Sequence, residues 1–259
     1  MTLPSLFVAH GSPMLALEDN GYTHFLANLG RELPKPEAIA IFSAHWDSPD
    51  QSVSVDESHG TMHDFYGFPE AMYELRYPAP GSASLTQRIG QLFDAGNLSY
   101  QPVLGRGLDH GAWVVLQKMY PDADIPVVEL SVDSRRSPAE QYAIGAMLKE
   151  LRQQNVLVIG SGGLVHNLRM IGQSDEADDW AMEFDEWIAK RLEGWKVQEL
   201  FDYDKKAPYV RQAVPSYGVE HFIPLFYAMG AADDDRQAKR LYQAYQYGNL
   251  SLNCWMFGS

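Results

Sequence analysis

The stretch AIAIFSAHW at residues 38–46 decides the fold class of this chain. Its first seven residues are almost all apolar and do not alternate with polar ones, which is typical of a strand buried on both faces. Such strands occur in parallel sheets that helices cover on both sides. The run ends at once in His45 and Trp46. The stretch therefore predicts an α/β fold with a histidine at the carboxyl end of a central strand.

A short apolar run followed by a sharp turn recurs elsewhere in the chain. Residues 6–9 lead into His10, and residues 156–159 lead through a glycine-rich turn to His166. Other elements are predicted from periodicity and end signals as strands at 53–55 and 125–131, helices at 22–31, 83–95, 137–153, 174–194 and 220–230, a helix opening near 112, and a terminal hairpin at 242–247 and 250–257. We expect a mixed, largely parallel central sheet flanked by helices.

Composition and charge limit the classes of function. The chain has 259 residues, of which 46% are hydrophobic and 21% charged, so we expect one soluble domain over residues 1–259. The formal net charge of -14 repels phosphate backbones, so nucleic acid is not an expected partner. No apolar run reaches the length of about 18 residues that a membrane helix needs.

The amino terminus and the single cysteine indicate the compartment. The first residues read as a strand rather than a secretory signal, because they lack a basic segment. Cys254 is the only cysteine, which excludes an internal disulfide, and we expect it to be a buried, unreactive side chain. These features predict a cytoplasmic protein. The sequence leaves its oligomeric state open between a monomer and a homodimer.

Four of the eight histidines stand at sharp turns of the chain, namely His10, His45, His166 and His221. Ligands of open α/β sheets bind at the carboxyl ends of the strands. Imidazole is a common ligand of transition metals and transfers protons near neutral pH. Any one of these histidines alone is better explained by bonding to nearby backbone, but several at equivalent positions favour a shared metal site. The spacing matches no local metal motif such as HExxH.

The glycines before His166 allow a ligand to approach the backbone closely. Residues 160–163 read GSGG, which is neither the G-x-S-x-G elbow of serine hydrolases nor a phosphate-binding loop. Ser161 is therefore a poor candidate for a nucleophile. A second loop, at residues 58–69, is long and rich in aromatic residues, so it is either functional or simply packed.

Six motifs together resemble a known family. HGSPM, SAHW, HDFYGFP, LDHGAW, GSGGLVHNL and EHFIPL occur in that order. The chain is similar to class III extradiol ring-cleavage dioxygenases, in the branch that includes DOPA 4,5-dioxygenases. The resemblance spans residues 5–257, and the set is specific although no single motif is. It implies an α/β fold with one mononuclear metal site at the strand ends.

The resemblance also implies the metal ligands. His10 and His45 match two of them, and His221 matches the third. Relatives of the protocatechuate type use a glutamate near that position, so Glu220 is the rival. Adjacent residues on a helix point about 100° apart, so we expect only one of the two to face the metal.

Two further histidines receive roles from the resemblance. His166 matches an active-site histidine that is either the acid/base or, without substrate, a fourth metal ligand. His110 matches a histidine that touches substrate or bound oxygen. We further expect His63, Tyr66 and Tyr217 to contact the substrate, with Phe68 as another possible wall of the pocket.

The function implied is extradiol cleavage of a small catechol, such as L-DOPA at the 4,5 position, by O2. The expected cofactor is one divalent metal per chain, Fe(II) for turnover or Zn(II) in the protein as isolated. Two alternatives stay open. A zinc-dependent hydrolase can use the same histidines with a metal-bound water. A non-catalytic protein similar to the Memo type would bind a metal or a partner surface.

Overall fold

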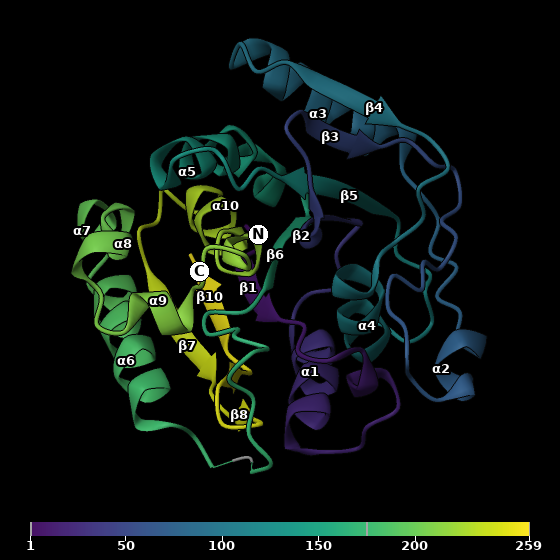
Figure 1. Cartoon of the computed structure of the whole chain (residues 1–259). Coiled ribbons are helices and arrows are strands. Elements are labelled where there is room, and N and C mark those ends of the chain that lie inside the picture. The colour runs from purple at the N-terminus through teal and green to yellow at the C-terminus, as the bar shows by residue number, and fades with distance from the viewer. Residues whose placement is uncertain (1, 175, 259) are drawn as a thin grey trace.

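In the computed structural model, which describes residues 2–174 and 176–258, a large mixed sheet runs through the molecule (Figure 1). The strands of its described part follow the order β4-β3-β5-β2-β6-β1-β10-β7, and β8 pairs with β9 beside them. The strands are β1 (Ser5–Ala9), β2 (Ala38–Asp47), β3 (Gln51–Ser54), β4 (Tyr100–Val103), β5 (Val127–Val132), β6 (Val156–Gly162), β7 (Ala238–Tyr242), β8 (Tyr245–Gln246), β9 (Leu250–Ser251) and β10 (Cys254–Phe257).

The helices flank the sheet. They are α1 (Gly21–Glu32), α2 (Glu70–Glu74), α3 (Ala83–Ala95), α4 (His110–Met119), α5 (Pro138–Met147), α6 (Asp179–Glu193), α7 (Val197–Phe201), α8 (Tyr203–Lys206), α9 (Val210–Ala213) and α10 (Pro224–Gly230), with 3-10 turns η1 (Pro13–Ala16), η2 (Lys149–Gln154) and η3 (Val219–His221). Within the described ranges, none of these helices combines the length and apolar character needed to cross a membrane.

The central strands are parallel and buried on both faces, as their sequences predict. β5, β2, β6 and β1 pair in parallel, while β10 and β7 continue the sheet antiparallel. In β2, Ala40 and Phe42 face one hydrophobic cluster, and Ile39 and Ile41 face the other. An uninterrupted apolar run is what such two-sided burial requires, because successive side chains point to opposite faces. The predicted α/β class is therefore confirmed.

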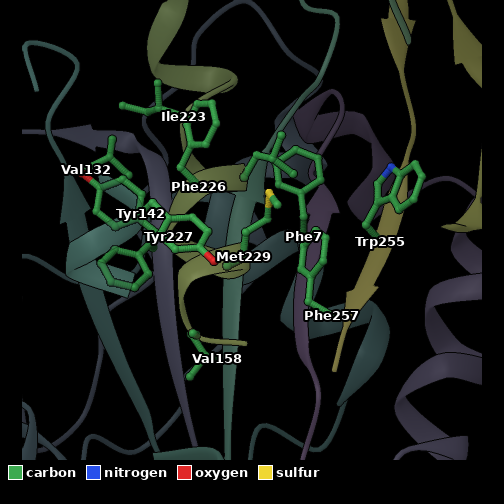
Figure 2. Packing of buried hydrophobic residues seen from close by; sticks show 14 of the residues in the cluster. Phe7, Val132, Tyr142, Val158, Ile223, Phe226, Tyr227, Met229, Trp255 and Phe257 are labelled. Carbon is green, nitrogen blue, oxygen red and sulfur yellow. The ribbon is translucent and has the colours of Figure 1, made fainter. Parts of the chain in front are cut away.

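Each face of the sheet has its own layer of helices. α1 and α4 cover one face, and α3, α5, α6 and α10 contribute to the cluster on the other (Figure 1). Figure 2 shows the cluster on the side of α10, where Phe7 of β1 and Val158 of β6 pack with Phe226 and Met229 of α10.

Several element boundaries differ from the sequence-based expectations. β2 runs beyond residue 44 to Asp47, with a shift in its pairing to β5 between Ser43 and Asp47. The helix predicted over 137–153 divides into α5 and η2, and the one predicted over 220–230 divides into η3 and α10. Of the helix predicted over 174–194, the part Asp179–Glu193 is helical, whereas residue 175 lies outside the described residues.

The elements that the sequence did not predict are short. β4, α2, α7, α8 and α9 each have four or five residues, too few for a hydrophobic period to show. The terminal hairpin is present, with β7 pairing to β10 and β8 to β9. Cys254 lies in β10 and is buried as expected, and burial raises the pKa of its thiol.

Glycines in β6 let the segment that carries His221 lie directly on the sheet. A Cβ atom at Gly162 would lie 2.1 Å from the carbonyl oxygen of His221, and one at Gly160 would lie 2.2 Å from that of Pro224. The His221 carbonyl instead accepts a hydrogen bond from the backbone N–H of Gly163 at 2.8 Å. The sheet and the η3–α10 segment can therefore meet only where β6 has no side chains.

Replacing Gly162 with alanine tests this close approach. We expect Gly162→Ala to lower the free energy of unfolding by about 1–3 kcal/mol, because the added methyl group overpacks a rigid backbone contact. Urea denaturation measures the change. Gly60→Ala is the matched control, since a Cβ at Gly60 meets no atom within 4 Å. Equal stability of the two variants would contradict the argument.

Candidate metal centre

Three of the predicted histidines converge at the carboxyl ends of the central strands. His10 follows β1 directly, His45 lies in the irregular end of β2, and His221 ends η3. One ring nitrogen from each lies within 4.8 Å of the others. β1 and β2 both pair with β6, so their ends lie at the same edge of the sheet. The strand order of the sheet therefore brings together residues that are far apart in the sequence.

The hydroxyl of Ser161 fixes the proton of the His10 ring. Ser161 Oγ donates its only proton to the carbonyl oxygen of Gly111 at 2.5 Å. The contact of 3.1 Å between Ser161 Oγ and His10 Nδ1 must then have the histidine as donor. Nδ1 carries the proton, and Nε2 keeps the lone pair that a metal needs.

Glu220 has the same effect on His221. Its Oε1 lies 3.0 Å from His221 Nδ1, and a carboxylate accepts the proton there. His221 Nε2 is buried and has no hydrogen-bond partner in the described structure. A buried polar atom without a partner is costly unless it has another function, and metal binding is one such function. Glu220, the rival ligand, thus holds the Nδ1 proton of the histidine beside it.

His45 meets His10 closely. The two Nε2 atoms lie 3.1 Å apart. Because the lone pair of His10 Nε2 points toward His45 Nε2, a proton or a cation between the two nitrogens stabilises their close approach. Arg106 donates to the carbonyl oxygen of His45 at 3.2 Å and to Asp109 at 2.9 Å, which holds the backbone of His45 in place.

The cluster disfavours positive charge on its imidazoles. Burial, together with the neighbouring histidines, lowers the pKa of His10, His166 and His221 well below the ordinary value. Burial and His110 lower the pKa of His45 to about 4. Near neutral pH the rings are therefore uncharged and keep lone pairs for a metal or for a proton.

Asp64 orients His110 beside this group. One carboxylate oxygen accepts from the backbone N–H of His110 at 2.9 Å, and the other lies 2.9 Å from its Nδ1. His110 opens α4, whose N-cap is Asp109. Its ring lies 3.8 Å, centroid to centroid, from that of His45. Asp64 was not singled out from the sequence, although it lies in the HDFYGFP motif.

His166 stacks on His221. The two rings are parallel within 5°, with centroids 3.7 Å apart. The chain after β6 is tied down around it, because the backbone N–H of His166 donates to Ala213 at 3.1 Å. Stacking places His166 beside His221 rather than within the group formed by His10, His45 and His221.

A cavity of about 420 Å³ opens onto these histidines. That volume suits a small aromatic ligand. His166 and His110 line it, and so do the ring side chains of Phe65 and Phe68 from the loop at residues 58–69. That loop is ordered by contacts among its own aromatic residues and with Trp113.

The expected substrate contacts His63, Tyr66 and Tyr217 do not line this cavity. His63 Nε2 lies 3.1 Å from the carbonyl oxygen of Leu75, and its ring packs on Trp113. Tyr66 is 92% exposed. The Tyr217 hydroxyl donates to Asn167 at 2.8 Å. Phe65, two residues after His63, lines the cavity instead.

The donors present fit a divalent metal. Three neutral imidazoles, two of them with their outer nitrogens engaged, match the ligand type that Fe(II) and Zn(II) accept in proteins. The unpartnered Nε2 of His221 is the strongest single indication.

The comparisons with known proteins agree with the fold and with the family that the six motifs indicate. A family model described as the catalytic LigB subunit of aromatic ring-opening dioxygenase matches residues 4–254. Two relatives named 4,5-DOPA dioxygenase extradiol, from Escherichia coli (strain K12) and Beta vulgaris, are 40% and 39% identical to this chain. Those alignments cover 96% and 98% of this chain, and 93% and 96% of the relatives.

A solved structure has the same fold as this chain. That of an uncharacterized protein from Escherichia coli K12 matches with a TM-score of 0.83 and 35% identity, over 99% of this chain and all of that one. Fold and relatives place the chain in the family of class III extradiol dioxygenases, as the six motifs predicted. The chain belongs to the LigB family of aromatic ring-opening dioxygenases.

Substitutions distinguish the ligand from its support. We expect His221→Ala to abolish tight binding of one Zn(II) per chain, because the buried lone pair is removed. Glu220→Gln should weaken binding by about tenfold to a hundredfold, as the loss of a residue that orients a ligand usually does. Competition with a chromophoric chelator measures both affinities. His24→Ala, at an exposed histidine, is the control; the reverse ranking would make Glu220 the ligand.

Proposed function

We propose that this protein is an extradiol ring-cleaving dioxygenase that inserts O2 into a small catechol. The metal ligands are His10, His45 and His221. The observation that carries the proposal is the convergence of three imidazole nitrogens at one end of a cavity of about 420 Å³. DOPA appears in the names of the relatives, so L-DOPA is the first substrate to test.

The metal and the side chains contribute different parts of the proposed reaction. A bound Fe(II) supplies the redox chemistry between the catechol and O2 that side chains cannot perform. The side chains hold the substrate and move its protons. Uncharged imidazoles at the ligand positions keep the site able to take up a divalent cation at neutral pH.

His166 is suited to proton transfer. It lines the cavity, and burial followed by the neighbouring His221 lowers its pKa, so its ring is neutral and can accept a proton. A hydroxyl of the catechol loses a proton when it binds, and His166 is positioned to take it and return it later. Stacking on His221 fixes the plane of the ring.

His110 acts as a second polar group of the cavity. Asp64 accepts the proton of His110 Nδ1, so that in the neutral ring Nε2 is the acceptor. An acceptor at this position can hold a catechol hydroxyl in one orientation, and orientation accelerates a reaction between bound partners.

Oxygen uptake tests the function directly. Protein reconstituted with Fe(II) under anaerobic conditions is given L-DOPA and then air. We expect oxygen consumption matched by a yellow ring-opened semialdehyde, and none with the His221→Ala variant. No uptake with several catechols, despite bound Fe(II), would contradict the proposal.

The role of His166 needs a separate variant. We expect His166→Ala to keep its metal and to lose at least about a hundredfold in kcat, the usual contribution of general acid/base catalysis. Metal content and oxygen uptake are measured on the same sample, with His24→Ala as the control. Loss of the metal would make His166 a ligand, and full activity would exclude the acid/base role.

A further inference from the structure

We propose that the cavity selects catechols whose ring substituent is apolar and uncharged, and that it disfavours charged catechols such as L-DOPA. The inference rests on the proposed function and names its substrate class. It comes from the walls of the cavity away from the histidines, which the reaction itself does not use.

The walls offer apolar surface and no formal charge. Away from the histidines they consist mainly of Pro13, Phe65, Phe68, Leu168, Ile171 and Leu250, and Gly11, Ser12 and Tyr247 complete the lining. Among the described residues that line the cavity there is no lysine, arginine, aspartate or glutamate. An ionised carboxylate or ammonium placed against this surface loses hydration and gains no ionic partner, which weakens binding.

Two aliphatic side chains of the wall are left uncovered by the rest of the protein. Leu168 is 57% exposed and Ile171 is 48% exposed, and both lie in the loop that follows β6. Both also line the cavity that contains His166. An apolar substituent on the bound ring would cover this surface and gain the free energy of its removal from water.

The charged residues beside the lining residues have other partners. Arg169, between Leu168 and Ile171, places its guanidinium over the ring of Tyr217 at 3.9 Å. Asp64 and Glu220 contact the Nδ1 atoms of His110 and His221. The formal net charge of -14 also opposes the approach of an anionic catechol.

A matched series of catechols tests the inference. The Fe(II) enzyme is given 4-ethylcatechol (uncharged), dopamine (cationic), 3,4-dihydroxyphenylacetate (anionic) and L-DOPA (zwitterionic). We expect kcat/KM for 4-ethylcatechol to exceed that of each charged catechol by about tenfold, because a charged substituent against the apolar wall loses part of its hydration and gains no ionic partner. Equal or higher kcat/KM for L-DOPA would overturn the inference.

A binding measurement separates this inference from the proposed function. Calorimetry with Zn(II)-loaded protein under anaerobic conditions gives the Kd of each catechol without turnover. The same preference for 4-ethylcatechol supports the inference even if no catechol is cleaved, whereas absence of cleavage contradicts the proposed function alone. Equal Kd values, or tighter binding of L-DOPA, overturn the inference.

Variants at the exposed wall of the cavity show which residues cause the preference for uncharged catechols. We expect Ile171→Arg to raise kcat/KM for 3,4-dihydroxyphenylacetate relative to 4-ethylcatechol by about tenfold, and Ile171→Gln, which adds polarity without charge, to do so far less. Arg169→Gln should leave the ratio of L-DOPA to 4-ethylcatechol unchanged. A selective loss of L-DOPA turnover in Arg169→Gln would show that Arg169 holds the carboxylate and would overturn the inference.

Discussion

The site depends on one backbone contact, between the end of β6 and the turn that carries His221. The N–H of Gly163 donates to the carbonyl oxygen of His221 at 2.8 Å, and the absence of a side chain at Gly162 leaves room for it. His10 N–H donates to the carbonyl of Gly162 at 3.1 Å, so the same short stretch also holds the first histidine. The end of β6 thus sets the spacing between His10 and His221.

Side-chain hydrogen bonds then decide what these histidines can do. Ser161 and Glu220 each accept the Nδ1 proton of one imidazole, which directs the other nitrogen toward the centre. Burial keeps the rings uncharged. Three neutral donors gathered in a region of low polarity suit a divalent cation better than any arrangement of protonated histidines would.

Sequence reasoning predicted the fold well because a strand buried on both faces has a distinctive pattern, as in residues 38–44. It also singled out His10 and His45, because the carboxyl ends of parallel strands share one edge of a sheet, whereas His221, which ends η3, was assigned from the family resemblance. It could not select Ser161 or Asp64, whose roles depend on contacts across the fold. Sequence reasoning also could not predict which side chains of the 58–69 loop point into the cavity, because an irregular loop has no repeating pattern of side-chain directions.

The loop at residues 58–69 is fastened to the body of the protein although it has little regular structure. Met62 N–H donates to Leu108 at 2.8 Å, and Leu108 N–H donates to Gly60 at 2.9 Å. The indole of Trp113 donates to the carbonyl of Met62 at 2.9 Å. The aromatic wall is thus preorganised, so the entropy of ordering it is lost during folding rather than when a flat ring binds. Discrimination between ligands then follows from a fixed shape rather than from closure of the loop.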